Sequence, residues 1–83
     1  MTREQMIEHL KSRGWKPTRK NSSTLVRPDR PEVRYKVLKH VIRKERAHPD
    51  SPALWTGVRW ARLTKCEVHD SGAIAGDWRS YYR

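Results

Sequence analysis

Residues 32–47 read EVRYKVLKHVIRKERA, and the secondary structure of this stretch decides the fold of the chain. Val33, Val37 and Val41 recur at intervals of four, as on one face of a helix. The same stretch alternates apolar and basic residues and is dense in β-branched side chains, which is typical of a strand. We favour a long strand, bulged between Val37 and Ile42, and keep the helix as the alternative.

The basic residues of this stretch are predicted to form one continuous face under either assignment. The chain carries 19 Lys and Arg against 9 Asp and Glu, and residues 1–49 hold 14 of those basic groups and 5 of the acidic ones. Because the charges are interleaved with apolar residues, they belong to a folded element, and a basic folded surface is the usual footprint of nucleic-acid binding. The residues predicted to contact nucleic acid are Arg19, Lys20, Arg34, Lys36, Lys39, Arg43, Lys44 and Arg46.

Local signals predict the other elements. Thr2 and Gln5 have capping-box spacing and Gly14 is a natural stop, so we expect a helix at residues 3–13. An exposed basic loop should follow at residues 16–21 and a loop at residues 49–52, with strands at residues 23–27 and 54–63 and a hairpin at residues 67–76. The expected fold class is α+β, an N-terminal amphipathic helix packed on a small antiparallel β-sheet of three to five strands.

The chain length predicts one domain, residues 1–83, with a thin core. Four Trp and no Phe are present, so tryptophans are expected to be the largest pieces of that core. The single cysteine, Cys66, is expected to be a small buried hydrophobe in a reducing, cytoplasmic setting, and no apolar run approaches the roughly 20 residues that cross a bilayer. The predicted core comprises Met6, Ile7, Leu10, Trp15, Val37 and Trp55.

Metal and catalytic sites are weakly indicated. Cys66 and His69 have a two-residue spacer, but no paired ligand knuckle is present, so neither a metal nor another cofactor is predicted. Asp70 and Ser71 are explained by turn formation, and the chain has neither a phosphate-binding glycine loop nor a nucleophile elbow. We therefore predict that the protein is not an enzyme.

Aromatic residues beside arginines are a second candidate for nucleic-acid contact, because such pairs stack unpaired bases. Trp60 lies between Arg59 and Arg62, although a tryptophan in this chain is more readily explained as core. Tyr81 and Tyr82 near the C-terminus have a similar setting.

Residues 6–37 have the predicted order helix, Gly-Trp, basic loop, short strand, turn and strand, and residues 7–15 are followed by KNSSTL at residues 20–25. This pattern resembles HicA-type toxins, which are small RNases with a fold like that of double-stranded-RNA-binding domains. The catalytic histidine of that family would fall at Ser23. The resemblance therefore implies a related fold without that cleavage reaction.

Nearly the whole chain is similar to small uncharacterised bacteriophage and prophage proteins, through Arg34-Tyr35-Lys36-Val37 and the Ser71-Gly72-Ala73-Ile74 hairpin. No functional residues carry over from that similarity. The leading hypothesis is a non-catalytic protein, phage-encoded, that binds DNA or RNA through its basic face. The alternatives are an inhibitor or adaptor that docks on an acidic host protein, and a small RNase that depends on His69 or His40. No membrane partner is expected.

Overall fold

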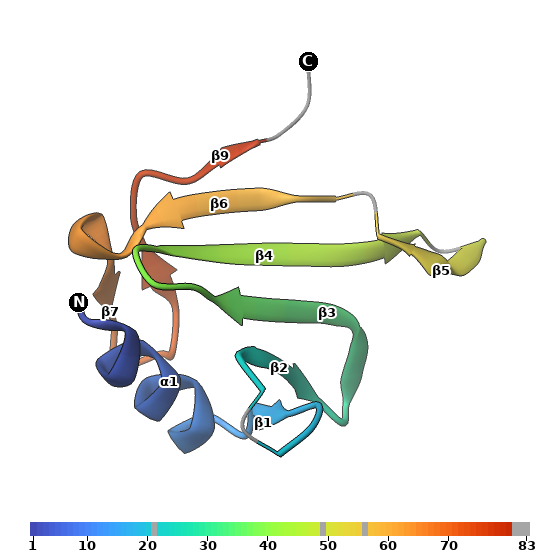
Figure 1. The fold of residues 1–83 in the computed structure, drawn as a ribbon, viewed down its shortest axis with the longest axis horizontal. Coiled ribbons are helices and arrows are strands. Elements are labelled where there is room, and N and C mark those ends of the chain that lie inside the picture. Colours follow the sequence, from blue (N-terminus) through green and yellow to red (C-terminus); the bar gives the residue numbers. More distant parts are fainter. Residues whose placement is uncertain (21, 49, 56, 81–83) are drawn as a thin grey trace.

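The computed structural model describes residues 1–20, 22–48, 50–55 and 57–80 (Figure 1). These residues form an α+β fold, as predicted, with one α-helix packed on an antiparallel sheet. The elements are α1 (Arg3–Ser12), β1 (Lys16–Pro17), β2 (Thr24–Arg27), β3 (Arg30–Val37), β4 (Val41–His48), β5 (Ser51–Trp55), β6 (Arg59–Arg62), the 3-10 helix η1 (Leu63–Lys65), β7 (Glu67–Val68), β8 (Ile74–Ala75) and β9 (Arg79–Ser80).

Both ends of α1 are fixed by the signals seen in the sequence. The Thr2 hydroxyl accepts a hydrogen bond from the Gln5 N–H (3.1 Å), and the Gln5 side chain accepts one from the Thr2 N–H (2.9 Å). At the other end Gly14 has a φ of +91°, and the Trp15 N–H donates to the Leu10 carbonyl (3.0 Å). This glycine-terminated turn is a Schellman motif, and it ends the helix where expected.

The main sheet has the strand order β1-β2-β3-β4-β6-β9, with every neighbouring pair antiparallel, and β5 pairs with β4 outside this path. β7 and β8 form a separate two-stranded hairpin, as predicted from its turn residues. Gly72 takes a φ of +91° there, and its N–H donates to the His69 carbonyl (2.8 Å).

The structure corrects the expectation for residues 32–47, which form a hairpin instead of one strand. β3 ends at Val37 and β4 begins at Val41, and the Leu38 N–H donates to the Val41 carbonyl across the turn (2.8 Å). Val37 therefore lies directly opposite Ile42. Directly opposite residues share a face of a sheet. Lys44 and Arg46 of β4 therefore lie on the same face as Tyr35 and Val33 of β3, the residues opposite them.

The basic residues of β3 and β4 therefore lie on two faces, and the prediction of one continuous face is wrong. We call the face that carries Leu25, Val37, Ile42 and Ala61 the helix face, because these residues form one buried cluster with Met6 and Leu10 of α1. The opposite face is the outer face. Lys44 and Arg46 lie on the helix face, whereas the outer face carries Arg34, Lys36 and Arg43.

Among the described residues, the core is built from aliphatic residues and methionine, which corrects the expectation that tryptophans dominate it. Met6, Leu10 and Val37 are fully buried, as predicted, whereas Ile7 and Trp15 are only partly buried at the margin. The side chain of Trp55 lies outside the described residues. Cys66 is buried, as expected. The largest fully buried side chains are Met6, Leu10, Leu25, Ile42 and Val37.

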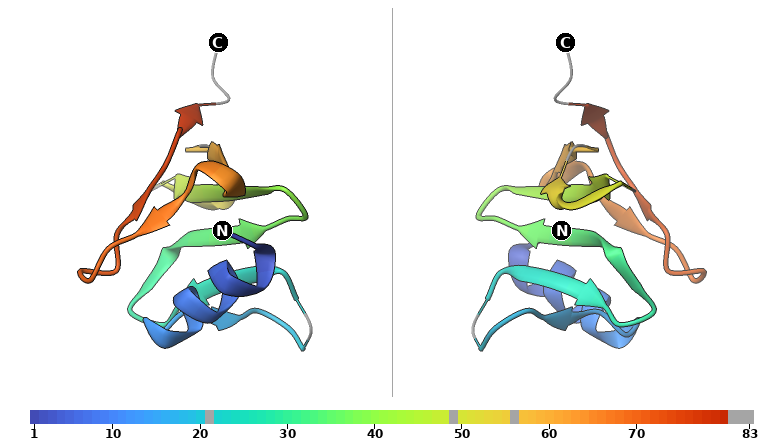
Figure 2. Two further views of the ribbon diagram at one scale, coloured as in Figure 1. Left: turned by 90° about the vertical axis from the view of Figure 1, so that its left-hand side faces the viewer. Right: turned by 90° about the vertical axis from the view of Figure 1, so that its right-hand side faces the viewer.

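The helix and the β7–β8 hairpin together form the layer over the helix face. The His9 Nε2 pairs with the Gly72 carbonyl (3.2 Å), and the Arg13 guanidinium donates to the Asp70 carbonyl. Figure 2 shows α1 beside β1 and β2, with the hairpin on the β6 and β9 side of the sheet. In Figure 1, α1 and β7 lie near one end of β4, and β5 lies at the other. The layer therefore leaves part of the helix face uncovered.

Candidate nucleic-acid interface

Three cations occupy the helix face beyond the buried cluster. Lys44 on β4 lies directly opposite Arg59 on β6, and Arg46 follows on the same face of β4. The carboxylates of Asp29, Glu45 and Asp77 form ion pairs with Arg27, Arg34, Arg43 and Arg62, and not with these three cations. Like charges placed directly opposite each other destabilise a sheet. The three cations are therefore a local electrostatic cost to the fold.

The electrostatics of Lys44 reflect this crowding. Partial burial lowers the pKa of Lys44, and the charges of Arg46, Arg59 and Arg30 lower that pKa further. The Lys44 Nζ also lies 5.9 Å from the centroid of the Tyr35 ring. A phosphate would offset both the repulsion among the cations and the loss of hydration at Lys44.

Two neighbouring cavities, which we together call the cationic groove, lie beside these residues. Lys44 and Arg59 border both cavities. The first cavity has a volume of about 290 Å³ and is also lined by Arg46, Gly57 and Ser80. The second, the aromatic recess, has a volume of about 260 Å³ and is also lined by Tyr35, Ala73, Ile74 and Trp78.

Each of the two aromatic walls of the recess is held by a contact with another residue. The Tyr35 ring meets the Trp15 ring edge-on, with centroids 4.7 Å apart at 68°. The Trp78 indole N–H donates to the Ile74 carbonyl (3.0 Å). Burial raises the pKa of the Tyr35 phenol, so its hydroxyl stays protonated at neutral pH. The walls are therefore neutral, and their rings are fixed before any ligand arrives.

On the outer face, by contrast, two of the basic residues form ion pairs with a carboxylate. Glu45 is buried, with 4% of its side chain exposed, and it accepts from the Arg34 Nε at 2.5 Å and pairs with the Arg43 Nη2 at 3.0 Å. A buried carboxylate needs such partners because it has lost its hydration. Two of the predicted contact residues, Arg34 and Arg43, are thus engaged in a buried ion-pair network.

The other predicted contact residues are dispersed. Arg19 and Lys20 are exposed in the loop between β1 and β2, and Lys39 is exposed in the β3–β4 turn. Lys36 lies on the outer face opposite Arg43. Of the eight predicted residues, the structure thus places Lys44 and Arg46 in the cationic groove and gathers Arg34, Lys36 and Arg43 on the outer face.

Sequence reasoning missed Arg59, Tyr35 and Trp78 as residues of this site. Arg59 was considered only as a neighbour of Trp60, which lies on the outer face with Arg79 5.7 Å from its ring centroid. No sequence signal links Arg59 to Lys44, because their proximity depends on the register between β4 and β6. Tyr81 and Tyr82 lie outside the described residues.

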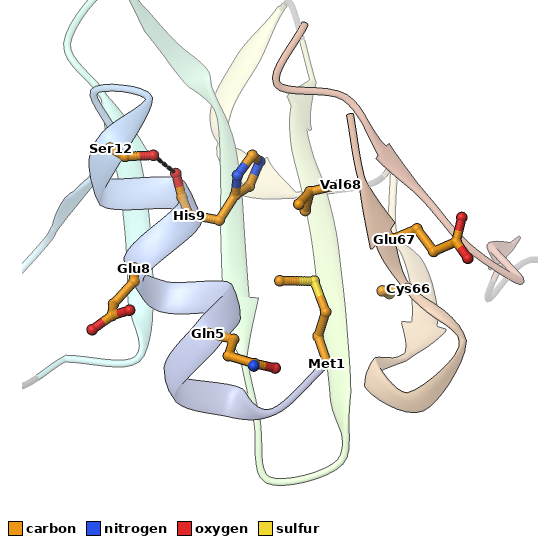
Figure 3. A pocket seen from close by; sticks show the side chains of 8 residues that line it. All are labelled: Met1, Gln5, Glu8, His9, Ser12, Cys66, Glu67 and Val68. Atoms are coloured by element: carbon orange, nitrogen blue, oxygen red, sulfur yellow. Dashed lines mark hydrogen bonds between the residues drawn. The ribbon is translucent and has the colours of Figure 1, made fainter. Parts of the chain in front are cut away.

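A further cavity of about 700 Å³ lies between α1 and β7 (Figure 3). Its two carboxylates, Glu8 and Glu67, point outward on opposite sides. The thiol of Cys66 donates to the Arg62 carbonyl (3.3 Å), and burial raises its pKa, so it is protonated at neutral pH. The residues around this cavity hold the helix to the hairpin and bring no acid–base pair together.

Across the described part of the chain, no group of three or more His, Cys, Asp or Glu residues is placed to hold a metal ion. None of the helices described is long and apolar enough to span a membrane. Comparison with protein families, curated proteins and solved structures finds no match to this chain.

Proposed function

We propose that this chain is a non-catalytic nucleic-acid-binding protein whose cationic groove holds backbone phosphates. The observation that carries the proposal is the Lys44–Arg59 pair, two cations directly opposite each other with Arg46 beside them. Like charges placed directly opposite each other destabilise a sheet, and such unfavourable arrangements are expected at functional sites. A polyanion is the ligand that turns this repulsion into attraction.

The overall charge supports the same ligand class. The formal net charge of +10 raises the local concentration of any polyanion and speeds its encounter with the protein. Phosphate contacts release counterions, so the affinity should fall steeply as salt is added.

The turn considered for catalysis has a structural explanation. The His69 N–H donates to the Ala73 carbonyl (3.0 Å), and the Ala73 N–H donates to the Ser71 hydroxyl (3.4 Å). His40, the other histidine considered for an RNase, lies in the β3–β4 turn, where its backbone carbonyl accepts from the Leu63 N–H (2.9 Å). These contacts favour binding without cleavage.

Fluorescence anisotropy with labelled DNA and RNA oligonucleotides tests the proposal. We expect a dissociation constant tighter than about 1 mM at about 50 mM salt, weakening as salt is raised. The Lys44→Gln/Arg59→Gln variant should bind less tightly than the Arg19→Gln/Lys20→Gln variant, which has the same net charge. Failure of the wild-type protein to bind any oligonucleotide would contradict the proposed function, and equal losses in the two variants would contradict the assignment of the groove.

A further inference from the structure

The aromatic walls of the recess indicate that the groove binds more of a nucleic acid than its phosphates. A groove that served only duplex phosphates would gain nothing from fixed aromatic walls beside its cations. In a duplex the bases are stacked inside, and a protein reaches phosphates and base edges in the grooves. The faces of aromatic side chains contribute when a base is unpaired and stacks on them.

The size of the recess agrees with one unpaired base. Its volume of about 260 Å³ is close to the lower limit of about 300 Å³ for small-molecule sites. It is thus suited to one planar group of a polymer. The neighbouring part of the groove, of about 290 Å³, continues along β4 toward Arg46 and Gly57.

Two features prepare the walls for such a base. The Trp78 indole is anchored through its N–H, and the Tyr35 ring rests edge-on against Trp15, so stacking requires little further ordering of either ring. Lys44 and Arg59 border both parts of the groove, which places cations where the phosphate of the stacked nucleotide would lie.

We propose that the cationic groove binds single-stranded nucleic acid, with one unpaired base in the aromatic recess between Tyr35 and Trp78 and its phosphate between Lys44 and Arg59. This assignment rests on the proposed function and adds the strandedness of the ligand. DNA and RNA share the required chemistry, a planar base followed by a phosphodiester, and the test below includes both.

The position of Ala73 offers a substitution that fills the recess and leaves every cation in place. Ala73 lines the recess and is exposed, and it takes part in the hairpin through its backbone. Ala73→Leu should therefore fold and obstruct the base. Ala75→Leu is the matched control, because Ala75 is exposed in the same hairpin and does not line the recess.

The experiment compares anisotropy titrations of an oligothymidylate and an oligouridylate of about ten nucleotides with a mixed-sequence DNA duplex of equal length, at about 50 and about 200 mM salt. We expect the wild-type protein to bind at least one of the single strands about ten-fold or more tighter than the duplex, since stacking of one base contributes a factor of roughly 5 to 150. Ala73→Leu should lose most of that preference, because its affinity for the single strands falls more than its affinity for the duplex, and Ala75→Leu should keep the preference.

The outcomes separate this inference from the proposed function. Duplex bound as tightly as both single strands, or a single-strand preference that survives Ala73→Leu, would overturn the inference and leave nucleic-acid binding intact. Absence of binding to all three probes would overturn both. Comparison of the affinities for the oligothymidylate and the oligouridylate shows whether the groove prefers single-stranded DNA or RNA.

Discussion

The two faces of the β3–β4–β6 sheet differ in how their basic residues are paired. On the outer face, Arg34 lies directly opposite Glu45, and the buried carboxylate of Glu45 also holds Arg43. On the helix face, Lys44 lies directly opposite Arg59, and cations alone lower the pKa of Lys44 beyond the effect of burial. Residues that alternate along β4 thus belong to an ion-pair network on one face and to a cluster of cations on the other.

This difference teaches that a count of basic residues does not locate a binding surface. Arginines that hold a buried carboxylate compensate a charge that has lost its hydration, so removing them or the carboxylate would leave a buried charge unpaired. Cations placed together have the opposite effect, because they repel one another until an anion arrives. We therefore assign a structural role to the Glu45 network and a binding role to the cationic groove.

Glu45→Gln should produce the largest effect on stability. The substitution keeps the shape of the side chain but leaves Arg34 and Arg43 without their counter-charge, and we expect a loss of about 2 to 3 kcal/mol in the free energy of unfolding. The loss would be larger if the two arginine side chains were completely buried, but those of Arg34 and Arg43 remain 25% and 29% exposed. Urea denaturation measures the change.

Glu32→Gln is the matched control for this prediction. Glu32 is exposed near the start of β3, and its substitution should change the free energy of unfolding by less than about 0.5 kcal/mol. Similar losses in Glu45→Gln and Glu32→Gln would show that the Glu45 network adds nothing specific to the stability of the sheet.

The pH dependence of binding should show whether Lys44 contacts the bound phosphate. In the free protein the pKa of Lys44 is lowered by burial and by Arg46, Arg59 and Arg30, and a bound phosphate should raise it again. Binding then takes up a proton, so affinity should fall as the pH rises from the lowered pKa toward the usual 10.5. The neighbouring Tyr35 stays neutral through most of this range because burial raises its pKa.

Titrations with an oligoadenylate, whose bases do not ionise at alkaline pH, provide the measurement. Lys44→Arg keeps the charge at all these pH values and should bind with a flatter pH profile than the wild-type protein. Profiles of equal steepness would mean that Lys44 does not contact the ligand.

Lys44→Gln should have the smallest effect, and one of opposite sign to Glu45→Gln. Removing one of the repelling cations should raise the free energy of unfolding by about 0.5 kcal/mol at neutral pH. Because the folded pKa of Lys44 lies below its unfolded value, the destabilisation by its charge is fully present below the folded pKa and is relieved as the pH rises toward 10.5. The advantage of Lys44→Gln should therefore shrink at alkaline pH, and a destabilised variant would argue that Lys44 supports the fold.

Elements that depend on nearby residues could be predicted from the sequence. The capping pair Thr2 and Gln5, the stop at Gly14 and the turn around Gly72 act within a few residues, and each was found where expected. The helix–sheet fold class follows from these signals together with the β-branched runs.

The site depends on contacts that local signals do not reveal. The β3–β4 turn uses Leu38, Lys39 and His40, which include none of the residues that usually mark a hairpin. Missing that turn reversed the face assigned to Lys44 and Arg46 relative to β3. The buried position of Glu45 and the pairing of Lys44 with Arg59 follow from strand register, which the pattern of one strand does not specify.

The central claim is that the cations of the groove, and not those of the outer face, bind the ligand. The most direct test compares Lys44→Gln/Arg59→Gln with Lys36→Gln/Arg79→Gln, two variants of equal net charge that alter opposite faces. For a single-stranded oligonucleotide, the groove variant should lower the log–log salt slope by about 1.4, or about 0.7 for each lost phosphate contact, and should bind about ten-fold less tightly than the outer-face variant. Equal salt slopes and affinities, or a larger loss in the outer-face variant, would contradict the account.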